Sequence, residues 1–297
     1  MPNTTDMQIP SNRVRDIERY IHEQLTSQYP DGEIRAFIRM LFEEYLGWDT
    51  AQLLLHHDDT VNQSDLLKFH WAAAALKQNR PIQHIIGHTT FCDCHITVTP
   101  DVLIPRPETE EMVTTALRLL SPERHPRRIV DLCTGSGCIA IALSKNIPTA
   151  NVFAIDISQN ALTIAQKNAQ QNGVSINFIQ TDILRQGTGL PNGPFDLIIS
   201  NPPYIADWER TGMGHNVLDH EPHIALFVPD DAPLCFYKAI GDYAMHNLSP
   251  AGVLMLEINE RLGQETCETL QSKDLAVQLL QDFNGKDRFI VATLKKS

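Results

Sequence analysis

The spacing of apolar residues divides the chain into a helical N-terminal part and an alternating remainder. From Arg13 to about Lys77, apolar residues recur every three or four positions, which is the period of an amphipathic helix. The first such stripe consists of Val14, Ile17, Ile21 and Leu25. Gly47 and Asn62 mark breaks between helices. We therefore expect a small helical domain over residues 1 to 80.

Beyond residue 80 the pattern changes to short apolar runs between helical stretches. Polar and apolar positions alternate between Pro81 and Pro100, which predicts a hairpin in a linker that we bound at residues 81 to 107. The spacing then predicts helices near 108 to 120, 137 to 146 and 158 to 172. Asn284-Gly285 joins two final apolar runs as the turn of an antiparallel hairpin. Strands that alternate with helices indicate an α/β fold over residues 108 to 297.

The most informative motif, Asn201-Pro202-Pro203-Tyr204, directly follows the apolar run at residues 195 to 200. Proline cannot donate a hydrogen bond and has a restricted φ, so this strand end presents hydrogen-bond acceptors in a fixed position. The Asn201 side-chain oxygen and a backbone carbonyl would accept both hydrogens of a planar NH2 group, with Tyr204 against its face. The same residues also occur as an ordinary turn after a strand.

A second motif, a glycine turn, lies between an apolar strand that carries Asp131 and a helix that begins near residue 137. Gly135 and Gly137 let the backbone approach a ligand, and the helix start offers unpaired N–H groups. Asp156 ends the next strand, where it can accept both hydroxyls of a ribose. Asp182 follows the strand after that and can accept from an adenine amino group. Together these residues predict a nucleoside site.

The glycine spacing also fits a dinucleotide-binding fingerprint, because an acid follows about twenty residues later. Asp131 lies inside the strand before the glycines, and a later strand ends in the Asn201 motif. An S-adenosylmethionine enzyme uses the first acid near the amino acid end of its cofactor and has no pyrophosphate to bind. We therefore favour S-adenosylmethionine, with S-adenosylhomocysteine as product, over a nicotinamide cofactor.

These motifs resemble those of class I methyltransferases, which have a seven-stranded Rossmann-like sheet and here follow a small helical domain. Further blocks look like the signatures of HemK-type protein-glutamine N5-methyltransferases: residues 80–87, 102–110, 221–226 and 285–289. For the cofactor, the resemblance implies Asp131, Cys133, Thr134, Gly135, Ser136, Gly137, Asp156, Ile157, Asp182, Ile183 and Asn201. For the substrate and catalysis, it implies Asn201, Pro202, Pro203, Tyr204, Arg106, Glu108 and Glu221. It also implies that the domain over residues 1 to 80 recognises the substrate.

The implied activity is methylation of the glutamine in the Gly-Gly-Gln loop of bacterial class I peptide-chain release factors. Cys133 stands where these enzymes more often have glycine, and it is also typical of the sister enzyme that methylates a glutamine of ribosomal protein L3. Residues 105–110, Pro-Arg-Pro-Glu-Thr-Glu, favour the release factor. A nucleic-acid adenine N6-methyltransferase could use the same acceptor motif and is a third alternative.

Composition is consistent with an enzyme and disfavours direct nucleic-acid binding. Hydrophobic residues make up 42% of the 297 residues, and the formal net charge is -12. That charge has the wrong sign for affinity based on phosphates. We find no apolar run long enough to span a membrane, and Met1 to Thr5 do not begin a secretory signal. We expect a cytoplasmic monomer.

Two other features have competing interpretations. The spacing of His84, His88, Cys92, Cys94 and His95 superficially resembles a zinc site, but their apolar alternating surroundings favour a hairpin, and we expect no metal. Residues 205 to 233 form a long segment directly after the acceptor motif. Long loops in compact domains are usually functional, which favours a substrate-facing lid over a solvated insertion.

Overall fold

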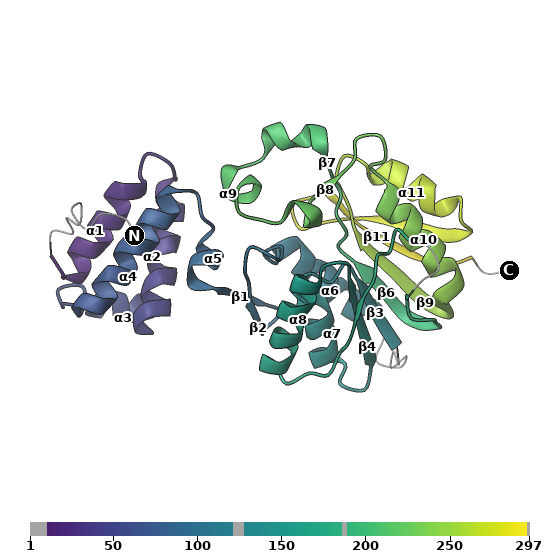
Figure 1. The fold of residues 1–297 in the computed structure, drawn as a ribbon, viewed down its shortest axis with the longest axis horizontal. Helices are drawn as coiled ribbons and strands as arrows, with labels where there is room; N and C mark the ends of the chain where they lie inside the picture. Colours follow the sequence, from purple (N-terminus) through teal and green to yellow (C-terminus); the bar gives the residue numbers. More distant parts are fainter. Residues whose placement is uncertain (1–10, 121–127, 186–188, 296–297) are drawn as a thin grey trace. The chain divides into compact units, whose positions relative to one another are not determined.

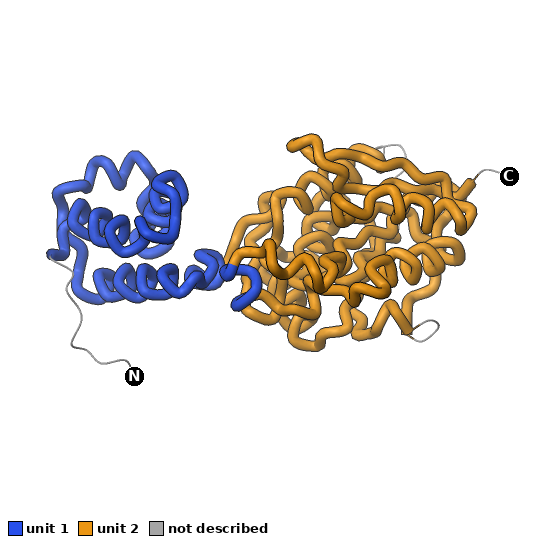
Figure 2. Tube along the Cα trace, turned by 90° about the horizontal axis from the view of Figure 1, so that it is seen from above, with its two compact units in different colours: residues 1–87, 215–220 blue, residues 88–214, 221–297 orange. Residues whose placement is uncertain are grey.

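The computed structural model describes residues 11–120, 128–185 and 189–295, and this chain divides into two compact units. The first unit runs up to Gly87 and also includes His215–His220. The second unit comprises His88–Gly214 and Glu221–Ser297 (Figure 2). The predicted linker over residues 81 to 107 is thus divided between the two units.

The first unit is helical, as the spacing predicted. Its elements from the N-terminal part are α1 (Val14–Leu25), α2 (Asp31–Leu46), α3 (Thr50–Leu55), α4 (Gln63–Lys77) and α5 (Ile82–Ile86). Helix α2 ends at Gly47, whose φ of 69° is left-handed. Asp49 and Gln52 form a capping box that starts α3. The predicted stripe on α1 is fully buried, and the Phe42 and Phe69 rings meet at 4.4 Å in the same core.

The second unit contains a seven-stranded sheet in the order β10-β11-β9-β6-β3-β4-β5 (Figure 1). These strands are β3 (Arg128–Leu132), β4 (Asn151–Asp156), β5 (Asn177–Gln180), β6 (Phe195–Ser200), β9 (Leu248–Glu257), β10 (Leu275–Gln281) and β11 (Asp287–Leu294). Only β11 runs against the others, paired antiparallel to β9 and β10. Strand order reverses beside β3, so β3 and β6 are neighbours although β4 and β5 come between them in sequence. Ligands bind at such switch points in α/β sheets.

Helices cover both faces of this sheet. Side chains alternate along each strand, so Ile129 faces one core while Val130 faces the other. The first core includes α6 (Pro107–Leu119), α7 (Cys138–Asn146) and α8 (Gln159–Gln171). The second includes α10 (Cys235–Asn247) and α11 (Gly263–Gln271). The helices α6, α7 and α8 begin within one residue of their predicted starts, whereas α10, α11 and β9 were not predicted from the sequence.

The predicted hairpin in the linker is present as β1 (His88–Phe91) and β2 (Cys94–Thr97). The His88 and His95 rings lie 4.4 Å apart across the pair, and Cys94 is buried. In the described part of the chain, no three His, Cys, Asp or Glu side chains are grouped as metal ligands. All six cysteines are free thiols.

The segment after the acceptor motif is more regular than we expected. It forms β7 (Ile205–Ala206), the 3-10 helix η3 (Asp207–Gly212), α9 (His215–Leu218), the 3-10 helix η4 (His223–Ala225) and β8 (Phe227–Val228). Strands β7 and β8 pair in parallel and form a separate two-stranded sheet. Within the described residues, the search for a helix long and apolar enough to cross a membrane found none.

Candidate cofactor and substrate site

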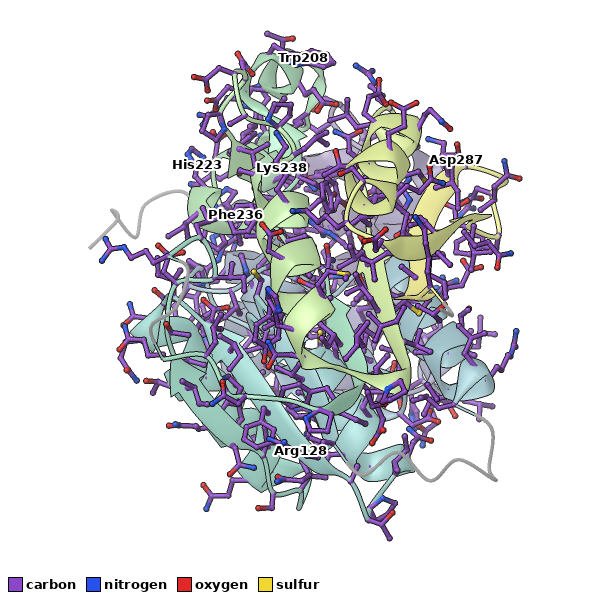
Figure 3. All side chains as sticks on the ribbon, turned by 90° about the vertical axis from the view of Figure 1, so that its right-hand side faces the viewer. Arg128, Trp208, His223, Phe236, Lys238 and Asp287 are labelled. Carbon is purple, nitrogen blue, oxygen red and sulfur yellow. The ribbon has the colours of Figure 1, made fainter. Side chains whose placement is uncertain are left out.

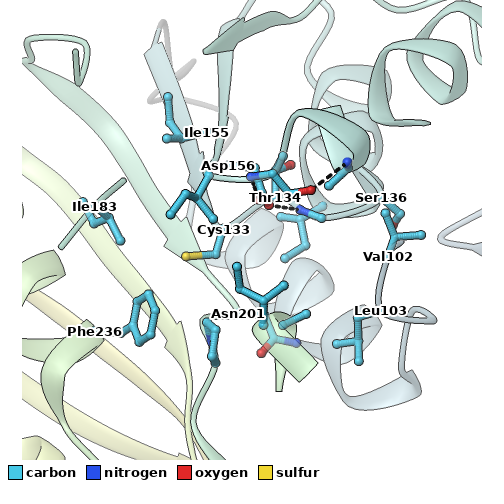
Figure 4. A pocket seen from close by; sticks show the side chains of 18 of the residues that line it. Val102, Leu103, Cys133, Thr134, Ser136, Ile155, Asp156, Ile183, Asn201 and Phe236 are labelled. Atoms are coloured by element: carbon cyan, nitrogen blue, oxygen red, sulfur yellow. Dashed lines mark hydrogen bonds between the residues drawn. The ribbon is translucent and has the colours of Figure 1, made fainter. Parts of the chain in front are cut away.

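A cavity of about 450 Å³ lies at the carboxyl ends of the central strands of the second unit (Figure 4). The segments that follow β3, β4, β5 and β6 each contribute to its lining: Cys133 to Ser136, Asp156 to Ser158, Thr181 to Leu184, and Asn201 with Pro203. Further walls come from parts of the segments 101–109 and 224–236 and from three residues of α7 and α8: Cys138, Ile139 and Ala161. Phe236 also lines the cavity, and it lies away from Arg128, which begins β3 at the opposite end of the sheet (Figure 3).

The two glycines of the turn have different roles. Gly135 has φ 54°, and a Cβ added there would meet nothing within 4 Å, so the cavity-lining backbone is open to a ligand. Gly137 has φ 81°, and an added Cβ would lie 2.9 Å from the Ala165 Cβ on α8. Gly137 is not among the cavity-lining residues. Its lack of a side chain serves helix packing rather than the ligand approach that we predicted.

Cys133 also adopts a left-handed backbone, with φ 62°. This conformation favours glycine, so a cysteine at this position carries some backbone strain. The Cys133 side chain lines the cavity, and burial raises the pKa of its thiol well above the usual value. The thiol is therefore neutral and acts as a small apolar side chain.

Asp156 joins the end of β4 to the glycine turn. Its Oδ2 accepts the Gly135 N–H at 2.8 Å, and its Oδ1 accepts the Ser158 N–H at 2.9 Å, both within the site shown in Figure 4. Burial raises the pKa of Asp156, and these backbone donors counteract that rise. Each carboxylate oxygen retains a further lone pair, so Asp156 can still accept from a ligand hydroxyl.

The predicted adenine-binding residues also reach the cavity. Asp182 Oδ1 accepts the Leu184 N–H at 2.9 Å, and its Oδ2 lies 3.5 Å from Arg185 Nε. Ile157 and Ile183 line the same region, and Ile157 is 47% exposed. Two apolar side chains beside an acceptor suit a flat base with an exocyclic amine.

Asp131 is fully buried, and one of its oxygens lacks a partner. Its Oδ2 accepts the Thr134 hydroxyl at 2.5 Å, whereas its Oδ1 has no hydrogen bond within the described residues. Burial raises the pKa of Asp131 to about 7, although the Thr134 bond lowers it. Asp131 is absent from the cavity lining, whereas Thr134, which donates to it, lines the cavity. The structure therefore places Asp131 behind the glycine turn, rather than in contact with the cofactor as we predicted from the sequence.

The residues of the acceptor motif do not all line the same cavity. Asn201 and Pro203 line the main cavity, and Asn201 Nδ2 donates to Thr109 Oγ1 at 3.1 Å. Pro202 and Tyr204 are absent from that lining. Tyr204 lines a second cavity of about 350 Å³, together with Trp208 and Arg288. Its hydroxyl donates to Glu257 Oε1 at 3.1 Å, so the structure does not bring Tyr204 to the main cavity as we predicted.

The predicted substrate residues lie mostly behind the cavity. Glu221 is 4% exposed, forms an ion pair with Arg106 and accepts the Ile104 N–H at 3.0 Å. Arg106 lines the cavity, but Glu221 and Glu108 do not. Glu221 therefore positions Arg106 and the segment that carries it, rather than facing the cavity itself.

Comparisons with known proteins agree with this geometry. Two family models match: the PrmC N-terminal domain over residues 17–87 and the methyltransferase small domain over residues 112–223. A release factor glutamine methyltransferase from Flavobacterium psychrophilum is 42% identical over 271 residues, which is 90% of this chain and 94% of that protein. One from Bacteroides thetaiotaomicron is 38% identical over 93% of this chain and 98% of that protein. The chain belongs to the release factor glutamine methyltransferase family.

Membership confirms the predicted fold, the predicted S-adenosylmethionine-dependent methyltransferase activity and the family resemblance. Among solved structures, the hMettl16 catalytic domain in complex with the MAT2A 3'UTR hairpin 6 has a TM-score of 0.52 and 14% identity, with 80% of this chain and 83% of that chain covered. At that identity the likeness concerns the fold alone. The individual site residues remain predictions.

The cavity fits S-adenosylmethionine, the cofactor of the release factor glutamine methyltransferase family. Asp156 lines the cavity and would accept from the ribose of the ligand. Ile157, Asp182 and Ile183 would hold the adenine. When bound, the cofactor supplies an electrophilic methyl group on a positively charged sulfur.

Two residues of this region were not among our site predictions. Thr109 lies on α6 and is 3% exposed, and Glu257 ends β9 and is 1% exposed. An acid at the end of an apolar strand is the pattern that led us to Asp156, so Glu257 could have been found from the sequence. The position of Thr109 beside it could not, because 148 residues separate them.

Proposed function

We propose that this chain methylates the side-chain nitrogen, N5, of the glutamine in the Gly-Gly-Gln loop of class I peptide-chain release factors. The observation that carries the proposal is that Asp156 and Asn201 line one cavity. An acid suited to a nucleoside ribose and an amide suited to a planar NH2 group thus share the same space. Relatives from Flavobacterium psychrophilum, Bacteroides thetaiotaomicron and Lactococcus lactis are named release factor glutamine methyltransferases, which supports this substrate.

An amide nitrogen is a poor nucleophile because its lone pair is delocalised, so the enzyme must act by orientation and polarisation. Asn201 lines the cavity, and its side-chain oxygen would accept a hydrogen of the glutamine NH2 and stabilise the positive charge that grows on nitrogen. The Pro202 carbonyl is the second acceptor that the sequence predicted, but Pro202 does not line this cavity. Bound S-adenosylmethionine would supply the electrophilic methyl carbon, and the residues of the cavity would hold the glutamine nitrogen toward it. An amide methylated on nitrogen while still protonated is strongly acidic, so no strong base is needed before transfer.

Selection of a folded release factor requires contacts beyond one glutamine. Standard protein interfaces bury roughly 800 Å² per partner, and a single side chain cannot supply that area. The helical unit is not needed to form the cofactor cavity, and it exposes Leu54, Leu55 and Trp71 to solvent at 72%, 81% and 63%. We assign recognition of the release factor to this unit, as the sequence predicted for residues 1 to 80.

The remaining assignments are part of the same proposal. The net charge of -12 disfavours a nucleic-acid substrate. A release factor substrate places the enzyme in the cytoplasm, and we propose that it acts as a monomer. Ribosomal protein L3 is the second candidate substrate because of Cys133.

The test is incubation of the enzyme with labelled S-adenosylmethionine and, separately, a class I release factor, ribosomal protein L3 and an adenine-containing oligonucleotide. Mass spectrometry then locates the added methyl group. We expect label on the Gly-Gly-Gln glutamine of the release factor and not on a variant with asparagine at that position. Label on L3 or the oligonucleotide, with the release factor unmodified, would replace the proposal by the corresponding alternative.

A further inference from the structure

A chain of hydrogen bonds connects Asn201 to the buried Glu257 through Thr109, which lines the main cavity beside Asn201. Asn201 Nδ2 donates to Thr109 Oγ1 at 3.1 Å, and Thr109 Oγ1 donates to Glu257 Oε2 at 2.7 Å. Tyr204 donates to the other oxygen, Glu257 Oε1, at 3.1 Å. Thr109 and Glu257 are 3% and 1% exposed, so bulk water cannot replace these partners.

The charge state of Glu257 decides the direction of the bonds in this chain. Burial raises the pKa of Glu257, whereas the hydrogen bonds from Thr109 and Tyr204 and the charge of Arg288 lower it. In its carboxylate form Glu257 can only accept, and its two oxygens take the hydroxyl hydrogens of Thr109 and Tyr204. The Thr109 hydroxyl has a single hydrogen, which is thereby committed to Glu257. Its oxygen can then only accept from Asn201, so the NH2 half of the Asn201 amide must face Thr109.

We infer that Thr109 and Glu257 are positioning residues that set the rotation of the Asn201 amide and so direct its carbonyl oxygen toward the substrate NH2 group. An asparagine amide can otherwise turn by 180° and exchange an acceptor for a donor at little steric cost. With the donor outward, Asn201 would repel the glutamine NH2 and favour the acceptor atoms of a glutamate. This inference rests on the proposed function, because it concerns how that substrate is selected.

The geometry separates this role from that of a catalytic base. Glu257 reaches Asn201 only through the Thr109 hydroxyl and does not line the main cavity. The amide of Asn201 cannot pass a proton onward without losing its conjugation. Thr109 and Glu257 therefore act on the reaction through orientation alone.

The decisive variants are Thr109→Val, which has the same shape without the hydroxyl, and Thr109→Ser, which restores it. We expect Thr109→Val to lower kcat on a release factor at least tenfold while the Kd for S-adenosylmethionine changes less than twofold. Thr109→Ser should recover kcat to within about threefold of the parent enzyme. Equal losses in both variants, or no loss in Thr109→Val, would show that the hydroxyl does not orient Asn201.

A second measurement reports the orientation without turnover. The parent enzyme with S-adenosylhomocysteine should bind the release factor more tightly than its Gln→Glu variant, and Thr109→Val should reduce that preference at least fivefold. The Asn201 side-chain NH2 resonances should shift in Thr109→Val and return in Thr109→Ser. These resonances are observable even if no release factor is methylated, so failure of the proposed function is distinguishable from failure of this inference. Unchanged resonances in Thr109→Val would overturn the inference.

Discussion

Asp156 and Gly135 are joined by a hydrogen bond of 2.8 Å from the backbone N–H of the glycine to the carboxylate Oδ2. The same carboxylate is the proposed acceptor for the cofactor ribose. One side chain therefore holds the turn in place and binds the ligand that the turn encloses. Loss of this acid removes a ligand contact and releases the loop beside it.

We expect Asp156→Ala to weaken S-adenosylmethionine binding by tenfold or more. A hydrogen bond to a charged group contributes about 1.5–3 kcal/mol, and 1.4 kcal/mol corresponds to a factor of ten. The affinity of Asp156→Asn should lie between those of the parent enzyme and Asp156→Ala, because an amide has one acceptor oxygen and a carboxylate has two. Isothermal titration measures both, with circular dichroism to establish folding. A folded Asp156→Ala variant with parental affinity would remove this acid from the site.

Replacement of Asn201 by alanine should lower kcat by roughly a hundredfold or more, as expected for loss of an oriented hydrogen-bond partner in a reaction centre. The Kd for S-adenosylmethionine should stay within about twofold, since the amide acts on the acceptor substrate. Asn177→Ala is the matched control, because that exposed side chain donates to Asn151 at the edge of the sheet. If Asn201→Ala retained near-parental turnover, the orienting role would be wrong.

The two glycines of the turn should respond differently to alanine. Gly137→Ala combines a left-handed backbone with a Cβ 2.9 Å from that of Ala165, and we expect it to destabilise the fold by about 2–5 kcal/mol. Gly135→Ala has only the backbone cost, about 1–2 kcal/mol, but places a methyl group beside the ligand. In urea unfolding, Gly137→Ala should therefore lose more stability than Gly135→Ala. In cofactor titration, Gly135→Ala should lose more affinity than Gly137→Ala. Equal stability losses would contradict the assigned packing role of Gly137.

Asp131 should make stability fall as pH rises. Its pKa in the folded state is about 7, above its usual 3.8, so between about pH 4 and 7 the folded state binds a proton that the unfolded state has lost. The contribution of this residue is fully present below pH 4 and declines toward pH 7 by at most about 1.4 kcal/mol per pH unit. Asp131→Asn lacks this dependence and should gain stability relative to the parent as pH rises. If the unfolding free energies of the parent enzyme and of Asp131→Asn change in parallel from pH 5 to 8, Asp131 has an ordinary pKa in the folded state.

The sequence predicted those site residues that directly follow a strand in the chain. Asp156, Asp182 and Asn201 each follow a short apolar strand, and parallel strands bring their carboxyl ends to one edge, so these residues were expected to meet. The strand β9 was overlooked, and with it Glu257. The packing of Gly137 against Ala165 depends on how α7 and α8 meet, which no local pattern encodes. The grouping of residues 215–220 with the helical unit is likewise a contact between distant segments.

The hydrogen bond between Thr109 and Glu257 joins positions 148 residues apart, and the one between Ile104 and Glu221 joins positions 117 apart. Helix α6 packs on α7 and on β9, so in a chain emerging from a ribosome α6 lacks part of its packing, and Thr109 lacks its acceptor Glu257, until β9 has been synthesised and has entered the sheet beside β6. Such distant pairings must overcome the entropy of closing a long loop before they contribute any stability. Substrate selectivity should consequently be acquired last: in refolding, release factor methylation should recover after the bulk of the helical signal. The newly made enzyme thus remains inactive toward its substrate until nearly the whole chain has folded.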